Sequence, residues 1–274
     1  MKNTRGFTLI ELIMVIVITG IIAATLTVFL RPAVQGYLDT RNRAELTDMA
    51  DTALRRMAQD IRSAVPLSIR SQSATCFQLA PTSAGGRYRM ALDTTPQANG
   101  ESKALDTSTP TNEFDVLSPL PNTVAAGDWV VVDNQSRDDV YDNNNRGTIK
   151  SIQTPAPGGA GIGQHRITLT ASTQFPVGYD RGRFVVVPQN EATVTYTCSG
   201  GALYRVAANT FGAAQCAPPA NSAIVATGVG NCVFNYTAND SATEQSGFIA
   251  LRLTLTRDGD SVTLTHGVHV ENAP

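Results

Sequence analysis

MKNTRGFTLIELIMVIVITGIIAATLTVFL, residues 1–30, sets an apolar helix apart from the rest of the chain. A short polar leader, residues 1–6, precedes a run that is apolar from Phe7 to Leu30 except for Thr, Gly and one acid, Glu11. As a helix rising 1.5 Å per residue, Leu12–Leu30 would measure about 28 Å, close to the thickness of the hydrocarbon core of a bilayer. We therefore expect residues 7–30 to form a membrane-spanning helix.

Glu11 is the exceptional residue of this run. A carboxylate inside lipid costs roughly 2.5–3.5 kcal/mol on insertion scales, so it requires a partner. A buried carboxylate is tolerated when a positive charge neutralises it. We therefore interpret Glu11 as a functional residue that needs a partner.

An ordinary secretory signal peptide is the first alternative, because the leader carries Lys2 and Arg5 and the next run is apolar. No A-x-A-like cleavage site follows the run, which leads directly into Arg31-Pro32. The small residue at the polar–apolar junction is Gly6, in front of the run. Cleavage after Gly6 would remove the leader and leave the helix on the mature protein. A plain signal-anchor helix is the second alternative.

The segment Gly6-Phe7-Thr8-Leu9-Ile10-Glu11 resembles the processing site of type IV pilins and pseudopilins. The resemblance implies that a membrane enzyme, prepilin peptidase, cuts after Gly6 and N-methylates Phe7, the new N-terminus. It also implies that Glu11, then the fifth residue, pairs with the N-terminal ammonium of a neighbouring subunit during filament assembly.

Length and composition describe the remainder of the chain. The 274 residues, less the leader and helix, leave about 200 for a head, enough for one sizeable core or two small ones. A net charge of −2 provides no basic surplus for nucleic acid. The low share of charged residues, 16%, and the abundance of Thr, Ser, Asn, Gly and Ala are typical of an exported β-rich domain.

Four cysteines follow the apolar run: Cys76, Cys198, Cys216 and Cys232. None forms a CxxC pair, so zinc or thioredoxin-like chemistry has little support. An even number in an exported domain favours disulfides, with three pairings to choose from. We favour Cys198–Cys216, which would close a Gly/Ala-rich loop; four reduced thiols are the alternative.

Residues 31–65 continue the helical pattern as an amphipathic segment that packs on the head. Pro32 lacks a backbone donor, which predicts a kink or a locally melted turn. Pro66 is expected to end the helix after Val65. Apolar residues recur at three- and four-residue steps, opposite a charged side: Leu46, Met49, Ala50, Ala53, Leu54, Met57, Ile61 and Val65.

After Pro66 the periodicity changes to that of β-strands separated by Gly, Pro, Asn and Asp clusters. The last two predicted strands flank Arg257-Asp258-Gly259-Asp260, and Asp-Gly is a favoured hairpin turn. Strands are predicted at Thr75–Ala80, Tyr88–Leu92, Glu113–Leu117, Trp129–Asp133, Thr148–Gln153, Arg166–Thr170, Phe184–Pro188, Thr193–Cys198, Ala202–Val206, Cys232–Tyr236, Phe248–Thr256 and Ser261–Val270.

A helix followed by strands predicts an α+β, pilin-like fold. One long N-terminal helix, transmembrane in its first half and amphipathic in its second, would pack on the antiparallel sheet of a β-rich globular head, residues 66–274. We see no clean linker and no internal repeat within the head.

Oxygen-rich and His-containing segments raise the question of a metal. The loop from Asp133 to Asn145 concentrates carboxylate and amide oxygens, which Ca²⁺ prefers. It lacks the turn Gly and the closing Glu of an EF-hand, so we interpret it as a solvated, turn-rich loop. His266 and His269 lie three residues apart on a predicted strand and so face opposite sides. We expect no metal and no cofactor.

Catalytic signatures such as HExxH, GxSxG or a Walker motif are missing from the sequence. The Gly-rich segment Pro155–Gly163 lacks the Lys-Ser/Thr of a phosphate loop and is interpreted as a surface loop. We expect no catalytic residue and a protein that is not an enzyme. A membrane-tethered enzyme with a dispersed site is the distant alternative.

Further segments narrow the resemblance within the family. The helix end Ala53–Val65 resembles that of J-type pseudopilins and related large minor pilins. Three later segments are similar to a minor pilin of the mannose-sensitive haemagglutinin (MSHA) pilus of Gram-negative bacteria: Pro81–Arg89, Val194–Arg205 and His266–Pro274. The subunit at the apex of such filaments commonly lacks the acid at mature position five. Because this chain keeps Glu11, the resemblance implies a place just below the tip.

The function we expect is that of a minor pilin of a type IV, MSHA-type pilus that takes part in assembly or initiation near the tip. The implied partners are prepilin peptidase, other major and minor pilins, the inner-membrane assembly platform and, before assembly, the lipid bilayer, but no nucleic acid. The head would lie in the periplasm before assembly and on a cell-surface pilus afterwards. The alternatives are a J-class pseudopilin of a type II secretion system and a pilus-borne adhesive head that binds a surface or glycan.

Overall fold

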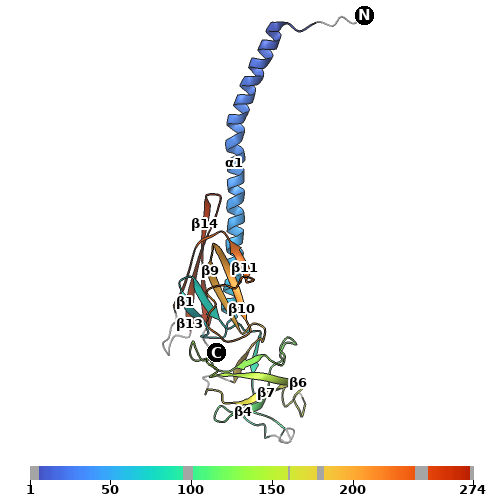
Figure 1. Cartoon of the computed structure of the whole chain (residues 1–274). Coiled ribbons are helices and arrows are strands. Elements are labelled where there is room, and N and C mark those ends of the chain that lie inside the picture. Colours follow the sequence, from blue (N-terminus) through green and yellow to red (C-terminus); the bar gives the residue numbers. More distant parts are fainter. Residues whose placement is uncertain (1–5, 95–100, 160, 178–181, 238–245, 272–274) are drawn as a thin grey trace, which may run out of the picture.

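One helix, α1, forms the long axis of the molecule, and its N-terminal half extends away from the sheets (Figure 1). α1 comprises Leu9–Arg62, 54 residues. It continues without a break through Pro32, so the local melting that we named as one outcome there is not seen. The kink stays a prediction. The structure is a computed structural model that describes residues 6–94, 101–159, 161–177, 182–237 and 246–271.

The C-terminal end of α1 lies at Arg62, before the predicted end at Val65. The Ser63 N–H still donates to the Gln59 carbonyl at 3.1 Å, but the Val65 N–H donates to the Ala80 carbonyl at 2.8 Å. Pairing with the chain that leaves the sheet therefore replaces the last helical hydrogen bonds.

The second half of α1 packs against the sheets along the predicted apolar stripe. Leu46, Met57 and Ile61 are at most 1% exposed, while the charged residues other than Asp60 lie on the opposite side. Met49 is half-buried at the margin of the same core. The amphipathic prediction is confirmed.

In the described part of the head the strands form three antiparallel sheets, which confirms the predicted α+β fold. The five-stranded sheet has the order β1 (Arg70–Ser73), β2 (Cys76–Leu79), β9 (Thr193–Ser199), β10 (Ala202–Ala208) and β11 (Ala223–Thr227). The three-stranded sheet has the order β12 (Val229–Thr237), β13 (Ser246–Arg257) and β14 (Asp260–Glu271). The six-stranded sheet has the order β3 (Ala84–Arg87), β8 (Arg183–Val187), β5 (Trp129–Val131), β6 (Arg146–Gln153), β7 (His165–Thr173) and β4 (Thr111–Val116).

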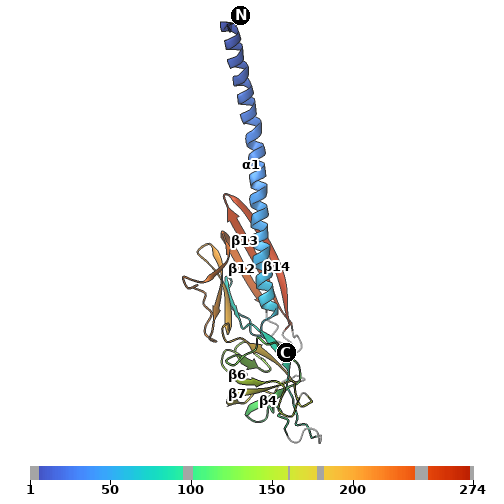
Figure 2. The same cartoon turned by 90° about the vertical axis from the view of Figure 1, so that its right-hand side faces the viewer.

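The six-stranded sheet is an insertion into the five-stranded one. β2 and β9 are hydrogen-bonded neighbours, with Leu79 opposite Val194, although the whole of the six-stranded sheet separates them in sequence. We call residues 84–187 the inserted lobe. It lies at the end of the molecule opposite the N-terminal half of α1 (Figures 1 and 2). The other two sheets, with α1 from Leu46 to Arg62, form the helix-proximal lobe.

Each lobe has its own hydrophobic core. In the helix-proximal lobe, α1 packs on both sheets, with Phe77 stacked on Tyr196 and edge-on to Phe234. In the inserted lobe, Phe114 lies edge-on to Phe184. A smaller apolar cluster joins the two lobes. The predicted head, 66–274, thus contains two main cores and a junction.

Several strand predictions differ from the structure. Tyr88–Leu92 is not a strand, and Tyr88 forms only an isolated bridge to Val116. β1, β3 and β11 were not predicted. Arg70–Ser73 and Ala84–Arg87 contain no β-branched or aromatic residue, so local propensity does not reveal them, and pairing with a neighbouring strand determines their conformation.

The predicted β13–β14 hairpin is confirmed. Asp258 and Gly259 have φ of 51° and 88°, the positive values that a tight type I′ turn requires at both central positions. The turn lies beside α1, where Arg43 binds Asp260 at 2.9 Å and Arg257 binds Glu45 at 3.1 Å.

Two disulfides join the cysteines, Cys76–Cys216 and Cys198–Cys232, so our Cys198–Cys216 pairing is wrong. Neighbouring residues on β9 face opposite sides of the sheet. Thr197 donates to the Cys216 carbonyl at 2.9 Å, which places Cys216 on the Thr197 face beside Cys76, the register partner of Thr197. Cys198 faces the other side, toward Cys232 in the helix-proximal core.

A buried ion network fastens the end of α1 to the five-stranded sheet. Asp60, 8% exposed, accepts hydrogen bonds from the Tyr196 hydroxyl (2.8 Å) and from Arg205 Nε (2.7 Å). Arg205 also donates to both carboxylate oxygens of Glu191, at 2.6 and 3.0 Å. These hydrogen bonds from Arg205 hold the pKa of the Glu191 carboxyl below its usual range. Burial raises the pKa of Tyr196, so its hydroxyl stays neutral and donates.

Candidate processing and assembly site

Gly6 and Phe7 lie in non-helical backbone directly before α1. Phe7 is 80% exposed, and a Cβ placed on Gly6 would meet nothing within 4 Å. The peptide bond between them is therefore accessible. Exposed, irregular segments are the preferred substrates of proteases. Because nothing in the chain crowds Gly6, the fold itself does not demand glycine at this position.

Thr8 and Glu11 form a capping box at the start of α1. The Thr8 hydroxyl accepts from the Glu11 N–H at 3.3 Å, and Glu11 Oε2 accepts from the Thr8 N–H at 3.1 Å. Oε2 also accepts from the Thr8 hydroxyl at 3.0 Å. This arrangement satisfies two backbone donors that a helix start leaves without intrahelical partners. The Thr-x-x-Glu signal is present in the sequence, but we considered Glu11 there only as a partner for another subunit.

The position of Glu11 suits a partnership with a newly formed N-terminus. Cleavage after Gly6 would convert the Phe7 nitrogen into an ammonium one residue before the cap. A carboxylate in the first turn is already favoured by the positive end of the helix dipole. Within the described residues, the carboxylate of Glu11 bonds only to its own cap at Thr8. These exposed hydrogen bonds can be exchanged for an ammonium from another chain.

The surface that follows the capping box is apolar and has no partner among the described residues. Every residue from Gly6 to Arg41 is exposed. An 18-residue window in α1 has a mean hydropathy of 2.7 and is not buried at all, so α1 is long and apolar enough to cross a membrane. Within the described residues this is the one helix of that kind, and it fits a membrane-anchored pilin.

The loop from Asp133 to Asn145 is organised around a buried amide. Asn134 donates to the Pro66 carbonyl at 2.7 Å and accepts from the Val140 N–H at 3.1 Å and from Asn145 at 2.9 Å. In the part of the chain that the structure describes, no group of three or more His, Cys, Asp or Glu could hold a metal ion.

The three histidines do not converge. His266 and His269 lie on opposite faces of β14, as their spacing predicted: His266 shares the core-facing side with Val268, and His269 faces the other way. His165 begins β7, where its Nε2 accepts from the Leu120 N–H at 3.0 Å and its Nδ1 lies 2.7 Å from the Thr154 hydroxyl. Burial lowers the pKa of His165.

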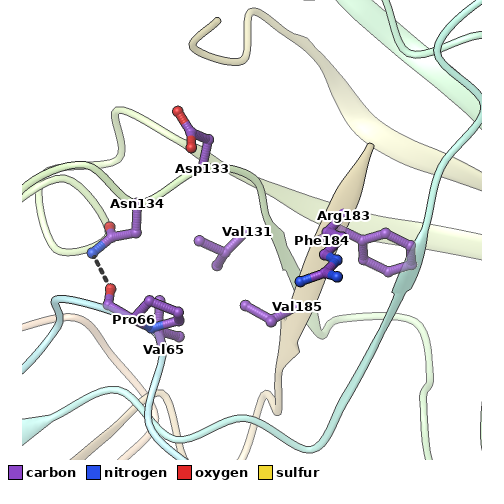
Figure 3. A pocket seen from close by; sticks show the side chains of 8 residues that line it. All are labelled: Val65, Pro66, Val131, Asp133, Asn134, Arg183, Phe184 and Val185. Carbon is purple, nitrogen blue, oxygen red and sulfur yellow. Dashed lines mark hydrogen bonds between the residues drawn. The ribbon is translucent and has the colours of Figure 1, made fainter. Parts of the chain in front are cut away.

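A small cavity lies where the two lobes meet (Figure 3). Its volume is about 20 Å³, room for roughly one water molecule. The hydrogen bond from Asn134 to the Pro66 carbonyl crosses its edge. The cavity is too small for a sugar or another organic ligand. Its lining consists of Val65, Pro66, Val131, Asp133, Asn134, Arg183, Phe184 and Val185.

A comparison with known protein families identifies the same N-terminal region as a motif. Residues 1–27 match a family model described as the prokaryotic N-terminal methylation motif. The match supports a type IV pilin-like protein and indicates a substrate of a prepilin peptidase. It ends within the exposed half of α1 and does not extend to the head. A comparison with curated proteins finds no match, and neither does a comparison with solved structures.

Proposed function

We propose that this protein is a minor pilin of an MSHA-type type IV pilus, similar to the minor pilin MshO, and that it acts in assembly or initiation just below the filament tip. The observation that carries the proposal is the methylation motif followed directly by an apolar half-helix that lacks a partner among the described residues. The finer assignment rests on sequence resemblance of three segments: Pro81–Arg89, Val194–Arg205 and His266–Pro274.

In this proposal the protein is a structural subunit and not an enzyme. Prepilin peptidase cuts after Gly6 and N-methylates Phe7. The apolar half of α1 holds the subunit in the inner membrane, with the head in the periplasm, until the assembly platform moves it into the pilus. There α1 packs against other pilin helices, and Glu11 exchanges its bonds to Thr8 for the ammonium of a neighbouring subunit.

The first test measures processing. Intact mass and N-terminal sequencing of the protein from native membranes, with and without the peptidase, should give a chain that starts at N-methylated Phe7 only when the peptidase is present. Gly6→Val should block cleavage. Gly20→Val is the matched control, because a Cβ at Gly20 also meets nothing within 4 Å. An uncut chain in the presence of the peptidase, or a cut after Leu30, would contradict the proposal.

The second test measures the charge pairing. Glu11→Ala should leave cleavage intact but reduce recovery of the protein in purified pili and its crosslinking to other pilins. Asp48→Asn, an exposed acid further along α1, is the control and should have no effect. Normal assembly of the Glu11 variant would contradict the charge pairing and, with it, the proposed position just below the tip.

Two alternative functions compete with this proposal, a J-class pseudopilin and an adhesive head. Deletion of the gene distinguishes the first of them from an MSHA-type pilin. Loss of surface pili supports the MSHA assignment, whereas loss of protein secretion with normal pili would identify a J-class pseudopilin. We rank adhesion second, because the single tryptophan, Trp129, is half-buried against Phe211 and does not provide an exposed aromatic binding surface.

A further inference from the structure

The loop between β10 and β11 crosses from the helix-proximal lobe to the inserted lobe. It contains no helix or strand between Ala208 and Ala223. We call residues 209–217 the strap. The strap lies along one face of β9, where alternate threonines bind it: Thr193 donates to the Thr210 carbonyl at 3.2 Å, and Thr195 accepts from the Gln215 N–H at 3.3 Å.

The strap is also attached to β2, the strand next to β9. Gln78 donates to the Gly212 carbonyl at 3.2 Å, and Cys76 forms its disulfide with Cys216. The disulfide is the covalent restraint on this loop. Since a long irregular loop gains conformational freedom when a crosslink is removed, opening the disulfide would leave the strap fastened to β9 and β2 by hydrogen bonds alone.

Phe211, near the start of the strap, packs on the inserted lobe. The Phe211 ring lies edge-on to Trp129 of β5, with centroids 4.9 Å apart. The guanidinium of Arg146, on β6, lies 4.0 Å from the Phe211 ring centroid. Phe211 is therefore inserted between an aromatic ring and a cation, both supplied by the other lobe.

Further hydrogen bonds join the two lobes, although Tyr141 and Arg70, which make two of them, also contact the strap at Phe211 and Gly212. Asn134 binds the Pro66 carbonyl, and the Tyr141 hydroxyl donates to the Ser68 carbonyl at 2.8 Å. Arg70 binds Asp138 at 3.0 Å. Loss of the strap would loosen the junction, while the hydrogen bonds to the Pro66 and Ser68 carbonyls and the Arg70–Asp138 ion pair would still join the lobes.

We propose that the Cys76–Cys216 disulfide is a redox lock on the strap, so that Phe211 clamps the inserted lobe to the helix-proximal lobe only in the oxidised protein. When the lock closes, two thiols lose two electrons and two protons to a disulfide-carrying oxidant, which becomes a dithiol. A dithiol reductant reverses the exchange and is itself oxidised to a disulfide. Cys198–Cys232 lies on the opposite face of β9 and has no part in the clamp.

The single tryptophan of the chain makes the proposal measurable, because Trp129 is the residue that Phe211 covers. The full chain in detergent is titrated with dithiothreitol while Trp129 emission and acrylamide quenching are followed. Alkylation and peptide mass spectrometry report which disulfide has opened. Emission should move to longer wavelength and quenching should increase in step with opening of Cys76–Cys216. A response that follows Cys198–Cys232, or no response when Cys76–Cys216 opens, would overturn the proposal.

Reciprocal variants sharpen the test. Cys76→Ser/Cys216→Ser should have the shifted emission without reductant and should not respond to it further. Cys198→Ser/Cys232→Ser should have native emission that shifts when dithiothreitol is added. Phe211→Ala, with both disulfides intact, should reproduce the shifted emission. The Phe211→Ala variant keeps the proposal testable if a cysteine variant does not fold. Native emission in Phe211→Ala would contradict the clamp.

Discussion

The two halves of α1 belong to one helix but differ in their surroundings. The half from Leu9 to Arg41 is exposed throughout, including Ile16, which is 62% exposed. In the second half, Met57 and Ile61 are fully buried. Both halves are helical without interruption, so backbone hydrogen bonding does not account for the difference. The two halves differ in exposure because the sheets pack beside the second half only.

This comparison shows which half of α1 is covered by the protein itself and which half is not. Soluble monomers rarely expose apolar patches larger than a few hundred Å². The packing partners of the first half are therefore lipid or other chains, whereas those of the second half are supplied by the head. Substitutions in the second half should change the stability of the head, and those in the first half should change only membrane or filament assays.

The largest difference should be between the two key acids of α1. Asp60→Ala leaves Arg205 and the Tyr196 hydroxyl without their shared acceptor, and breaking a buried ion pair on one side costs about 3–5 kcal/mol. Calorimetric unfolding of the full chain in detergent should show this loss. Glu11→Ala should leave the same transition unchanged, and a comparable loss in both variants would contradict the division of α1.

Two methionines provide the next test, because they place one residue type in both halves. Met57 is fully buried and Met14 is 55% exposed. Met57→Ala should lower the free energy of unfolding by about 2–5 kcal/mol, the range for truncating a buried side chain to Ala. Met14→Ala should have no effect on denaturant unfolding of the head. An unchanged midpoint for Met57→Ala would show that the packed half of α1 does not stabilise the head.

A smaller effect should mark the boundary between the halves, at the hairpin turn beside Arg43. Arg43 is exposed, and its ion pair with Asp260 should contribute only about 0.2–1 kcal/mol in a double-mutant cycle. The coupling should decrease when salt is added. Arg31→Ala, within the exposed half, is the control. A salt-independent coupling would argue against a simple surface ion pair.

The smallest expected effect is a pH dependence confined to the inserted lobe. Burial lowers the folded-state pKa of His165 below the usual 6.5, so the unfolded chain takes up the proton first as pH falls. Stability is then retained above pH 6.5 and falls between that value and the folded pKa, where the Leu120 N–H loses its acceptor. His165→Gln should flatten this slope in unfolding experiments between pH 7 and 5, and an unchanged slope would exclude His165 as its source.

The sequence predicted α1 and its two surfaces because both depend on local sequence patterns. The run after Phe7 is apolar over the length of a membrane span, whereas the stripe from Leu46 to Ile61 repeats at helical spacing, and the structure confirms the stripe. The accessible Gly6–Phe7 bond likewise agrees with the motif match. These features required no knowledge of distant contacts.

The disulfides and the insertion depend on contacts between distant strands and could not be predicted in the same way. The partner of Cys216 follows from the register of β2 against β9, which decides the face that each cysteine occupies. The β2–β9 pairing joins residues on either side of the inserted lobe, and no local sequence pattern predicts this pairing. The network around Asp60 was missed for the same reason, because Glu191 and Arg205 come from distant parts of the chain.

The pairing of Leu79 with Val194 also has an evolutionary consequence. Because these register partners are adjacent, the chain leaves for the inserted lobe and returns from it at nearly one point. A short turn there would convert β2 and β9 into a plain hairpin without moving α1 or its core. Since closing a longer excursion adds little entropy cost, the β2–β9 pairing can be kept whether the connection is a short turn or an entire module.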